Sequence, residues 1–157
     1  HQEYSGEKMT VQDSETNEAF IPWDIETSAG VDRQMLVLLL DAYREEGERI
    51  WLSLSPKITP YKVAVFPLLG NKPELINKAK EVFNNLKQEF MVSWDDRGNI
   101  GKRYAAQDEI GTPYCVTVDF DSLEKGDVTV RDRDSMKQER IKISELINYI
   151  KDGIQKK

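Results

Sequence analysis

The sequence predicts an α/β protein in which a mixed β-sheet is flanked by helices, and three observations support this. Residues 61–68 (YKVAVFPL) are continuously apolar, as a strand covered on both faces is. Residues 72–90 repeat apolar side chains at helical spacing, with Pro73 in the first turn. From residue 61 onward strands and helices follow the order β-α-β-α-β-β-α. Such alternation is typical of a layered sheet with two parallel crossovers first and a hairpin later.

The first part of the chain, residues 1–55, has a different pattern. A turn within VQDSETNEAF (11–20) can join two short strands, and the extended piece FIPWDIE follows. Apolar side chains on one face predict a buried helix over residues 31–46; they are Leu36, Leu39, Leu40 and Tyr43. Gly47 can end this helix, and the alternating IWLSLS (50–55) predicts a strand. The proline-containing SPKITPYK then leads to a second unit, so the predicted domains are 1–55 and 56–157.

The remaining elements of the second unit can be assigned in order. FMVSWDD (90–96) predicts a second strand, and RGNIGKRYAAQDEIG (97–111) predicts a glycine-flanked loop with a short helix. PYCVTVDF (113–120) and DVTVRDRD (127–134) predict a hairpin that turns at LEKGD. SELINYIKDGI (144–154) predicts the last helix, with Ser144 as its N-cap.

Composition excludes several classes of protein. With a net charge of −6 the chain is not a general polycation that coats nucleic acid, so any RNA contact must come from a local patch. The single Cys115 excludes intramolecular disulfides and cysteine-rich zinc sites and suits a reducing compartment. The longest apolar run, MLVLLL, is far shorter than the ~20 residues that span a bilayer. We expect a cytoplasmic protein without a membrane partner or a metal site of its own, and, because the chain opens at His1, a part of a longer polypeptide.

Arg33 has an unusual position, at the start of the helix predicted after SAGVDR. Ser28 can cap this helix, and the free N–H groups of its first turn attract anions. The helix dipole disfavours a cation at that end, so Arg33 should have an anionic partner. That partner is either a carboxylate, such as Asp32, Glu26 or one from another domain, or the phosphate of a ligand. The residues alone leave both interpretations open.

Longer stretches of the chain resemble a known family. FIPWDIETSAGVDRQML resembles motif 3 of the class II aminoacyl-tRNA synthetases, and its particular residues resemble those of glycyl-tRNA synthetase of the homodimeric type. Other stretches resemble that family in the same order; they are HQEYSG, YKVAVFPL, GNIGKRYAAQDEIGTPYCVTVDFDSL and VTVRDRDSM. The chain departs from the family at Thr27, where proline is usual, and at Ala105 and Ala106, where a basic pair is common.

The resemblance implies roles for the motif 3 segment. The positions that correspond to the glycine pocket are Glu26, Thr27, Ser28, Ala29 and Gly30. The positions that correspond to the ATP site are Gly30, Val31, Asp32 and Arg33, with Arg33 in the catalytic role. The chemistry fits these residue types, since an ammonium pairs with a carboxylate and a triphosphate pairs with a permanently charged planar fork. In the complete enzyme Mg²⁺ would be expected to bridge the phosphates of ATP.

The second unit, according to the same resemblance, is an anticodon-binding domain. Ligands gather at the carboxyl ends of parallel strands, and there the chain places aromatic, acidic and basic side chains. The predicted tRNA-contacting residues are Trp94, Asp96, Arg97, Lys102 and Arg103, accompanied by Asp95 and Tyr104. Strand alternation puts Arg131 and Arg133 together on one face and Asp132 with Asp134 on the other, so one face can meet RNA while the other is tied inward. For any single charge, a solvated or salt-bridged surface residue is the alternative.

These inferences lead to an expected function. The chain should be the carboxy-terminal part of a glycine–tRNA ligase, which uses ATP to join glycine to tRNA(Gly). The full-length enzyme should be a homodimer, and we expect no DNA among its partners. This part should be inactive alone. One alternative is a non-catalytic relative, such as an accessory subunit of a DNA polymerase, and another is a free-standing RNA-binding module. Both would have no use for the intact Glu26, Ser28 and Arg33.

Overall fold

The computed structural model describes residues 1–156 and consists of two compact units, His1–Gln34 and a second that begins at Met35. In the first unit, α1 (Gln2–Ser5) precedes two antiparallel strands, β1 (Val11–Gln12) and β2 (Ala19–Phe20). The Asp13 carboxylate accepts hydrogen bonds from the backbone N–H groups of Glu15 and Thr16 and so closes the turn between them. The predicted pair of short strands is therefore confirmed.

The next helix, α2 (Val31–Ala42), is shorter than the predicted one, and it is not buried. The chain leaves it at Tyr43 to form β3 (Tyr43–Glu46), which pairs antiparallel with β4 (Arg49–Leu52). Gly47, at a φ of 61°, lies in the turn of this hairpin instead of ending the helix. The predicted apolar face is exposed and only Ala42 is buried, because no described part of residues 43–156 forms a layer against it.

The second unit contains the predicted mixed sheet, in the order β6-β5-β7-β8-β9. Its strands are β5 (Val63–Pro67), β6 (Val92–Trp94), β7 (Tyr114–Val118), β8 (Asp127–Asp132) and β9 (Gln138–Lys142). Strand β5 pairs in parallel with both β6 and β7, whereas β8 pairs antiparallel with β7 and β9. The three parallel strands therefore form one side of the sheet, with β6 at its edge, and β5, the continuous apolar run, has a neighbour on each side.

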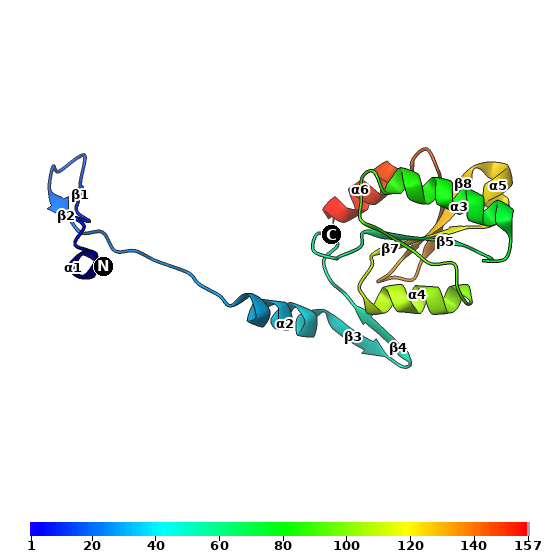
Figure 1. Cartoon of the computed structure of the whole chain (residues 1–157), viewed down its shortest axis with the longest axis horizontal. Coiled ribbons are helices and arrows are strands. Elements are labelled where there is room, and N and C mark those ends of the chain that lie inside the picture. Colours follow the sequence, from blue (N-terminus) through cyan, green and yellow to red (C-terminus); the bar gives the residue numbers. More distant parts are fainter. Residues whose placement is uncertain (157) are drawn as a thin grey trace. The chain divides into compact units, whose positions relative to one another are not determined.

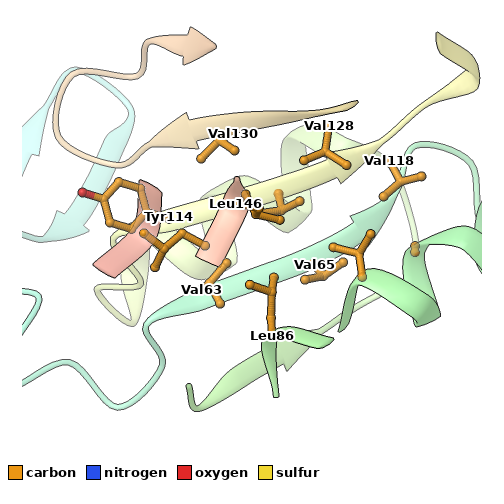
Figure 2. Close-up of a cluster of buried hydrophobic side chains, with 12 residues drawn as sticks. Val63, Val65, Leu86, Tyr114, Val118, Val128, Val130 and Leu146 are labelled. Atoms are coloured by element: carbon orange, nitrogen blue, oxygen red, sulfur yellow. The ribbon is translucent and has the colours of Figure 1, made fainter. Parts of the chain in front are cut away.

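Helices cover both faces of this sheet (Figure 1). Helices α3 (Pro73–Leu86) and α6 (Leu146–Lys156) pack on one face, and α4 (Ile100–Glu109) packs on the other. Alternate residues of β5 point to opposite layers: Val63 and Val65 join the larger core, while Ala64 and Phe66 contact α4. Figure 2 shows the larger core, where valines of β5, β7 and β8 lie together with Leu86 and Leu146.

Three further elements, all after residue 118, differ from the sequence prediction. The hairpin turn at LEKGD is a short helix, α5 (Phe120–Lys125), because Asp119 and Ser122 form a capping box at its start. Strand β9, which has an exposed and strongly charged sequence, was not predicted at all. Helix α6 begins at Leu146, so Ser144 is not its N-cap.

The β3–β4 hairpin belongs to the second unit and is bonded to α4 and to the segment after β8. Arg49 of β4 bonds to Asp108 of α4 and to the backbone carbonyl of Arg133, and Ser53 bonds to Asp134. The compact units consequently divide after Gln34, whereas the sequence predicted a boundary between residues 55 and 56. The assignment of residues 1–55 to a catalytic domain stays a prediction.

Candidate nucleic-acid interface

A cavity of about 510 Å³ opens at the carboxyl ends of β5 and β6. One wall is the segment after β5, and the other is the segment between β6 and α4; the lining residues are Leu68, Leu69, Gly70, Asn71, Asp96, Gly98, Asn99, Ile100 and Arg103. Parallel strands and the start of the following helix converge here, so the fold itself creates the hollow. The cavity combines apolar surface with a half-buried carboxylate and two amides.

Two glycines allow the walls of this cavity to form. A Cβ on Gly70 would overlap the backbone carbonyl of Asp96, so only glycine permits these two segments to approach so closely. Gly98 has a φ of +65°, a left-handed conformation that favours glycine, and it turns the chain into α4. The side chain of Asn99 then caps that helix by accepting a hydrogen bond from the backbone N–H of Lys102.

The predicted cations at this edge divide into exposed and buried ones. Arg97 is 89% exposed, and its guanidinium contacts Asp95 at 3.3 Å. Burial alone would raise the pKa of Asp95, but the backbone N–H and guanidinium of Arg97 outweigh it and lower that pKa. Lys102 is also exposed, on the first turn of α4. Arg97 and Lys102 can therefore reach a phosphate without rearrangement.

Arg103 requires a correction, because its side chain does not face solvent. The residue is 2% exposed, and its guanidinium donates to the backbone carbonyls of Pro67, Arg97 and Gly98 at 2.5, 3.0 and 2.9 Å. The predicted tRNA-contacting arginine is thus a buried residue that holds the two cavity walls together.

Trp94 requires a similar correction. Its ring is partly buried in the larger core and meets Phe83 of α3 edge to face, with ring centroids 5.8 Å apart. Packing against α3 occupies the ring, so Trp94 does not offer a stacking surface at the cavity.

Arg131 and Arg133 share one face, as strand alternation predicts, but that face is turned inward. Arg131 is 6% exposed and makes a bidentate ion pair with Asp108 at 2.8 and 2.9 Å. Arg133 is 2% exposed and donates to the carbonyls of Gly111 and Leu54 and to Asp134. Apart from Asp134, which is next in the chain to Arg133, their acceptors lie on α4, directly after it, and on the segment after β4, which the sequence did not place beside β8. Neither arginine is available to RNA.

Asp108 is a buried carboxylate that joins three elements of the fold, and the sequence pattern did not single it out. Its carboxylate is 3% exposed and accepts from both Arg131 and Arg49, so it joins α4, β8 and the β3–β4 hairpin. Burial alone would lower the pKa of Arg131, but the hydrogen bonds to Asp108 raise it. One signal was present in the sequence: the inward face of α4 repeats at helical spacing through Ile100, Arg103, Tyr104, Gln107 and Asp108. Three of these five side chains are polar and buried, which indicates internal hydrogen bonds.

The surroundings of α4 also explain the single cysteine. Cys115 lies in the smaller core beneath α4 with Phe66 and Tyr104. Burial raises the pKa of its thiol to about 12. The cysteine is therefore an inert core residue, as expected from its apolar neighbours in the sequence.

The motif 3 residues are placed in the first unit. Glu26 lines a cavity of about 810 Å³ together with His1, Gln2, Met9, Ile21, Pro22, Trp23 and Asp24. Thr27, Ser28, Ala29 and Gly30 form an exposed extended segment without regular structure, and Val31, Asp32 and Arg33 form the exposed first turn of α2. Because the helix begins at Val31, its N-cap position is Gly30 and not Ser28. The structure brings none of these seven residues into the cavity beside Glu26.

Residues 1–156 lack two kinds of feature. These residues contain no group of three or more His, Cys, Asp or Glu side chains arranged to hold a metal ion. None of the helices within this range is long and apolar enough to cross a lipid bilayer.

Two features, the mixed sheet and the cavity at the carboxyl ends of β5 and β6, indicate the class of protein to which the chain belongs. Residues 62–153 match the family described as the anticodon binding domain, and the chain belongs to this family. A crystal structure of prolyl-tRNA synthetase from Cryptosporidium parvum has a similar fold, with a TM-score of 0.62 and 30% identity over 67% of this chain and 23% of that one. These matches confirm the predicted fold class.

Curated relatives narrow the class further. Over 99% of its length the chain is 50% identical to glycine–tRNA ligase from Clostridium kluyveri, and it is 51% identical over 96% of its length to glycine–tRNA ligase from Chlorobaculum tepidum. The chain spans about a third of the length of these relatives, 34% and 33% respectively. The resemblance to glycyl-tRNA synthetases seen in the sequence is thereby confirmed.

Proposed function

We propose that the chain supplies anticodon recognition and the motif 3 segment to a glycine–tRNA ligase. The relatives at about 50% identity support the enzyme, and the match over residues 62–153 supports the recognition role of the second unit. A polymerase accessory subunit, the alternative raised by the sequence, gains no support from these relatives.

The observation that carries the recognition role is the cavity at the ends of β5 and β6. Single-stranded RNA is recognised when an unstacked base enters such a pocket and is read along its edge. Leu68 and Ile100 offer apolar surface to a base face, and Asp96 can accept a hydrogen bond from an exocyclic amino group, as that of cytosine. The exposed Arg97 and Lys102 would hold the flanking phosphates.

Electrostatics favour recognition by shape over recognition by charge. Residues 91–140 contain eleven acidic and eight basic side chains, and Arg103, Arg131 and Arg133 of that basic set are buried. Few cations remain for phosphates, so the salt dependence of tRNA binding should be modest. Base contacts in the cavity would supply much of the selectivity.

In the complete enzyme, the first unit would take part in the activation of glycine by ATP. In that proposal Glu26 pairs with the ammonium group of glycine, and the segment through Thr27, Ser28, Ala29 and Gly30 lines the amino-acid site. Gly30, Val31 and Asp32 lie against ATP, and Arg33 holds its phosphates while the glycine carboxylate attacks the α-phosphate, the bond to the β-phosphate breaks and pyrophosphate leaves. Mg²⁺ would enter the complete enzyme with ATP and would neutralise charge on its phosphates. The complete enzyme would be a cytoplasmic homodimer.

The test is a binding measurement with two RNAs: a tRNA(Gly) transcript and the same transcript with its anticodon cytosines replaced. The unmodified chain should prefer the first. Asp96→Ala should reduce this preference, because the acceptor for the amino group is removed, whereas the exposed Asp121→Ala on α5 should not. Equal affinity of the unmodified chain for both transcripts would contradict the proposed function.

A further inference from the structure

Arg103 combines a buried charge with an unusual set of partners. Its guanidinium is bonded to three backbone carbonyls, and no ion pair with a carboxylate is formed by this residue within the described chain. Burying a cation costs solvation, and carbonyl dipoles recover it only when several of them converge. An apolar residue at this position of α4 would pack without the cost of desolvating a charge. We therefore infer that Arg103 does more than fill the core.

The three carbonyls lie on both walls of the cavity. Pro67 ends β5, directly before the Leu68–Asn71 wall, and Arg97 with Gly98 forms the opposite wall. One rigid planar fork therefore ties the two walls to the first turn of α4. The guanidinium carbon also lies over the ring of Phe66, 6.0 Å from the ring centroid.

The charge of Arg103 also acts on the loop electrostatically. It contributes, after Arg97, to the lowering of the pKa of Asp95, the residue that begins this loop. Asp95 in turn accepts from the backbone N–H of Arg97. The backbone between Asp95 and Asn99 is thus held from below by Arg103 and at its start by Asp95, while its outer side faces solvent.

We propose that Arg103 is a positioning residue for base recognition: it sets the separation of the cavity walls, and with it the place of Asp96, and it binds no phosphate. The proposal rests on the proposed function. It differs from direct phosphate binding, which the sequence pattern alone favoured for this arginine.

Salt dependence separates the two roles. A residue that contacts a phosphate contributes about 0.7 to the slope of log affinity against log salt for single-stranded nucleic acid. A residue that only shapes the cavity contributes nothing to this slope, but its loss lowers the discrimination between base sequences.

The experiment measures affinity for the two tRNA transcripts over a range of salt concentrations. Arg103→Lys keeps the charge but loses the fork, and Arg103→Met keeps the stem but loses the charge. Both should lose about tenfold in affinity for the tRNA(Gly) transcript and most of the preference over the anticodon-substituted one, with an unchanged salt slope. The exposed Arg97→Ala is the matched control, and it should lower the slope while the preference survives.

A second variant does not depend on replacing a buried charge. Gly98→Ala disfavours the left-handed backbone at the carbonyl that Arg103 binds, and its Cβ would meet no described atom within 4 Å. It should fold, as judged by circular dichroism, and should also lose preference at constant slope.

Each outcome of these measurements supports or overturns the positioning role of Arg103. If Arg103→Met folds and binds with unchanged preference, or if its salt slope falls by about 0.7, the positioning role is overturned. If neither Arg103 variant folds, an unchanged preference of Gly98→Ala overturns it. If the unmodified chain shows no preference between the transcripts, the proposed function fails instead.

Discussion

Buried arginines dominate this molecule at the scale of single residues. Arg103, Arg131 and Arg133 are each at most 6% exposed, and each is satisfied by carboxylate or carbonyl oxygens on another element. A buried charge is tolerated only when all of its donors find partners, so each arginine fixes the position of several segments at once. The residue type looked like a surface feature in the sequence, yet in the fold it acts as a connector.

The buried pair of Asp108 and Arg131 should be important for stability. Removal of the carboxylate in Asp108→Ala leaves a buried guanidinium without its charge partner and frees Arg49 as well. We expect the free energy of unfolding to fall by about 3–5 kcal/mol, measured by urea denaturation.

The control for that change is Asp121→Ala on α5. Its side chain is 55% exposed and pairs with Lys125, which is 59% exposed. Such a surface pair should contribute less than about 1 kcal/mol. A loss at Asp108 no larger than the loss at Asp121 would contradict the assigned role.

At the scale of elements, two glycines in helices should respond to alanine in opposite directions. Alanine normally stabilises a helix relative to glycine by about 0.5–1 kcal/mol. Gly101→Ala in α4 would place its Cβ in ordinary contact, 3.5 Å from Asn99, so this gain should be seen in thermal unfolding. In α6, a Cβ at Gly153 would overlap the Tyr114 hydroxyl, so Gly153→Ala should cost about 1–3 kcal/mol instead. Equal effects of the two substitutions would show that α6 does not pack on Tyr114 in this way.

The start of α5 should make stability depend on pH. Burial alone would raise the pKa of Asp119, but the hydrogen bonds from Arg140 and Ser122 outweigh it, so the folded-state pKa is lowered. A lowered folded-state pKa means that the stabilisation is present above the ordinary pKa of about 3.9 and is lost as the pH falls through that value toward the folded-state pKa. Asp119→Asn keeps a capping side chain and removes the charge, so its loss of stability at pH 7 should shrink toward pH 3. Parallel stability curves for both proteins across this range would refute the assignment.

At the scale of the whole molecule, two activities can be tested separately: the binding of tRNA and the activation of glycine. The chain spans about a third of the length of its curated relatives, and Thr27–Arg33 is exposed instead of enclosed by further walls. We expect the chain alone to bind tRNA(Gly) but to catalyse no glycine-dependent exchange of pyrophosphate with ATP. Exchange activity that survives in the chain and disappears in Arg33→Ala would show that the site is complete here.

Much of the second unit could be predicted from sequence because its signals are local. The continuous apolar run of β5, the stripe of α3 and the alternating pattern of β8 each depend on which side chains must leave water, and these were confirmed. The β3 strand and β9 were missed because their charged sequences become strands only by pairing with a neighbour. A cavity lies where the sequence predicts the site, at the ends of the parallel strands, but three arginines assigned to its surface are buried, and the role of the cavity stays a prediction.

The sequence by itself determined the order of the main elements, the mixed sheet and the family, since burial patterns and long matching stretches need no knowledge of neighbours in space. Only the tertiary structure decided which charges face solvent. Strand alternation correctly paired Arg131 with Arg133 on one face, but it cannot say what covers that face. Asp108 and the hairpin after α2 cover it, and the carbonyls around Arg103 are likewise assembled from segments separated along the chain. The direction of a charged side chain depends on the partner that the fold brings to it, which is why Arg97 remains at the surface while Arg103, six residues later, lies inside.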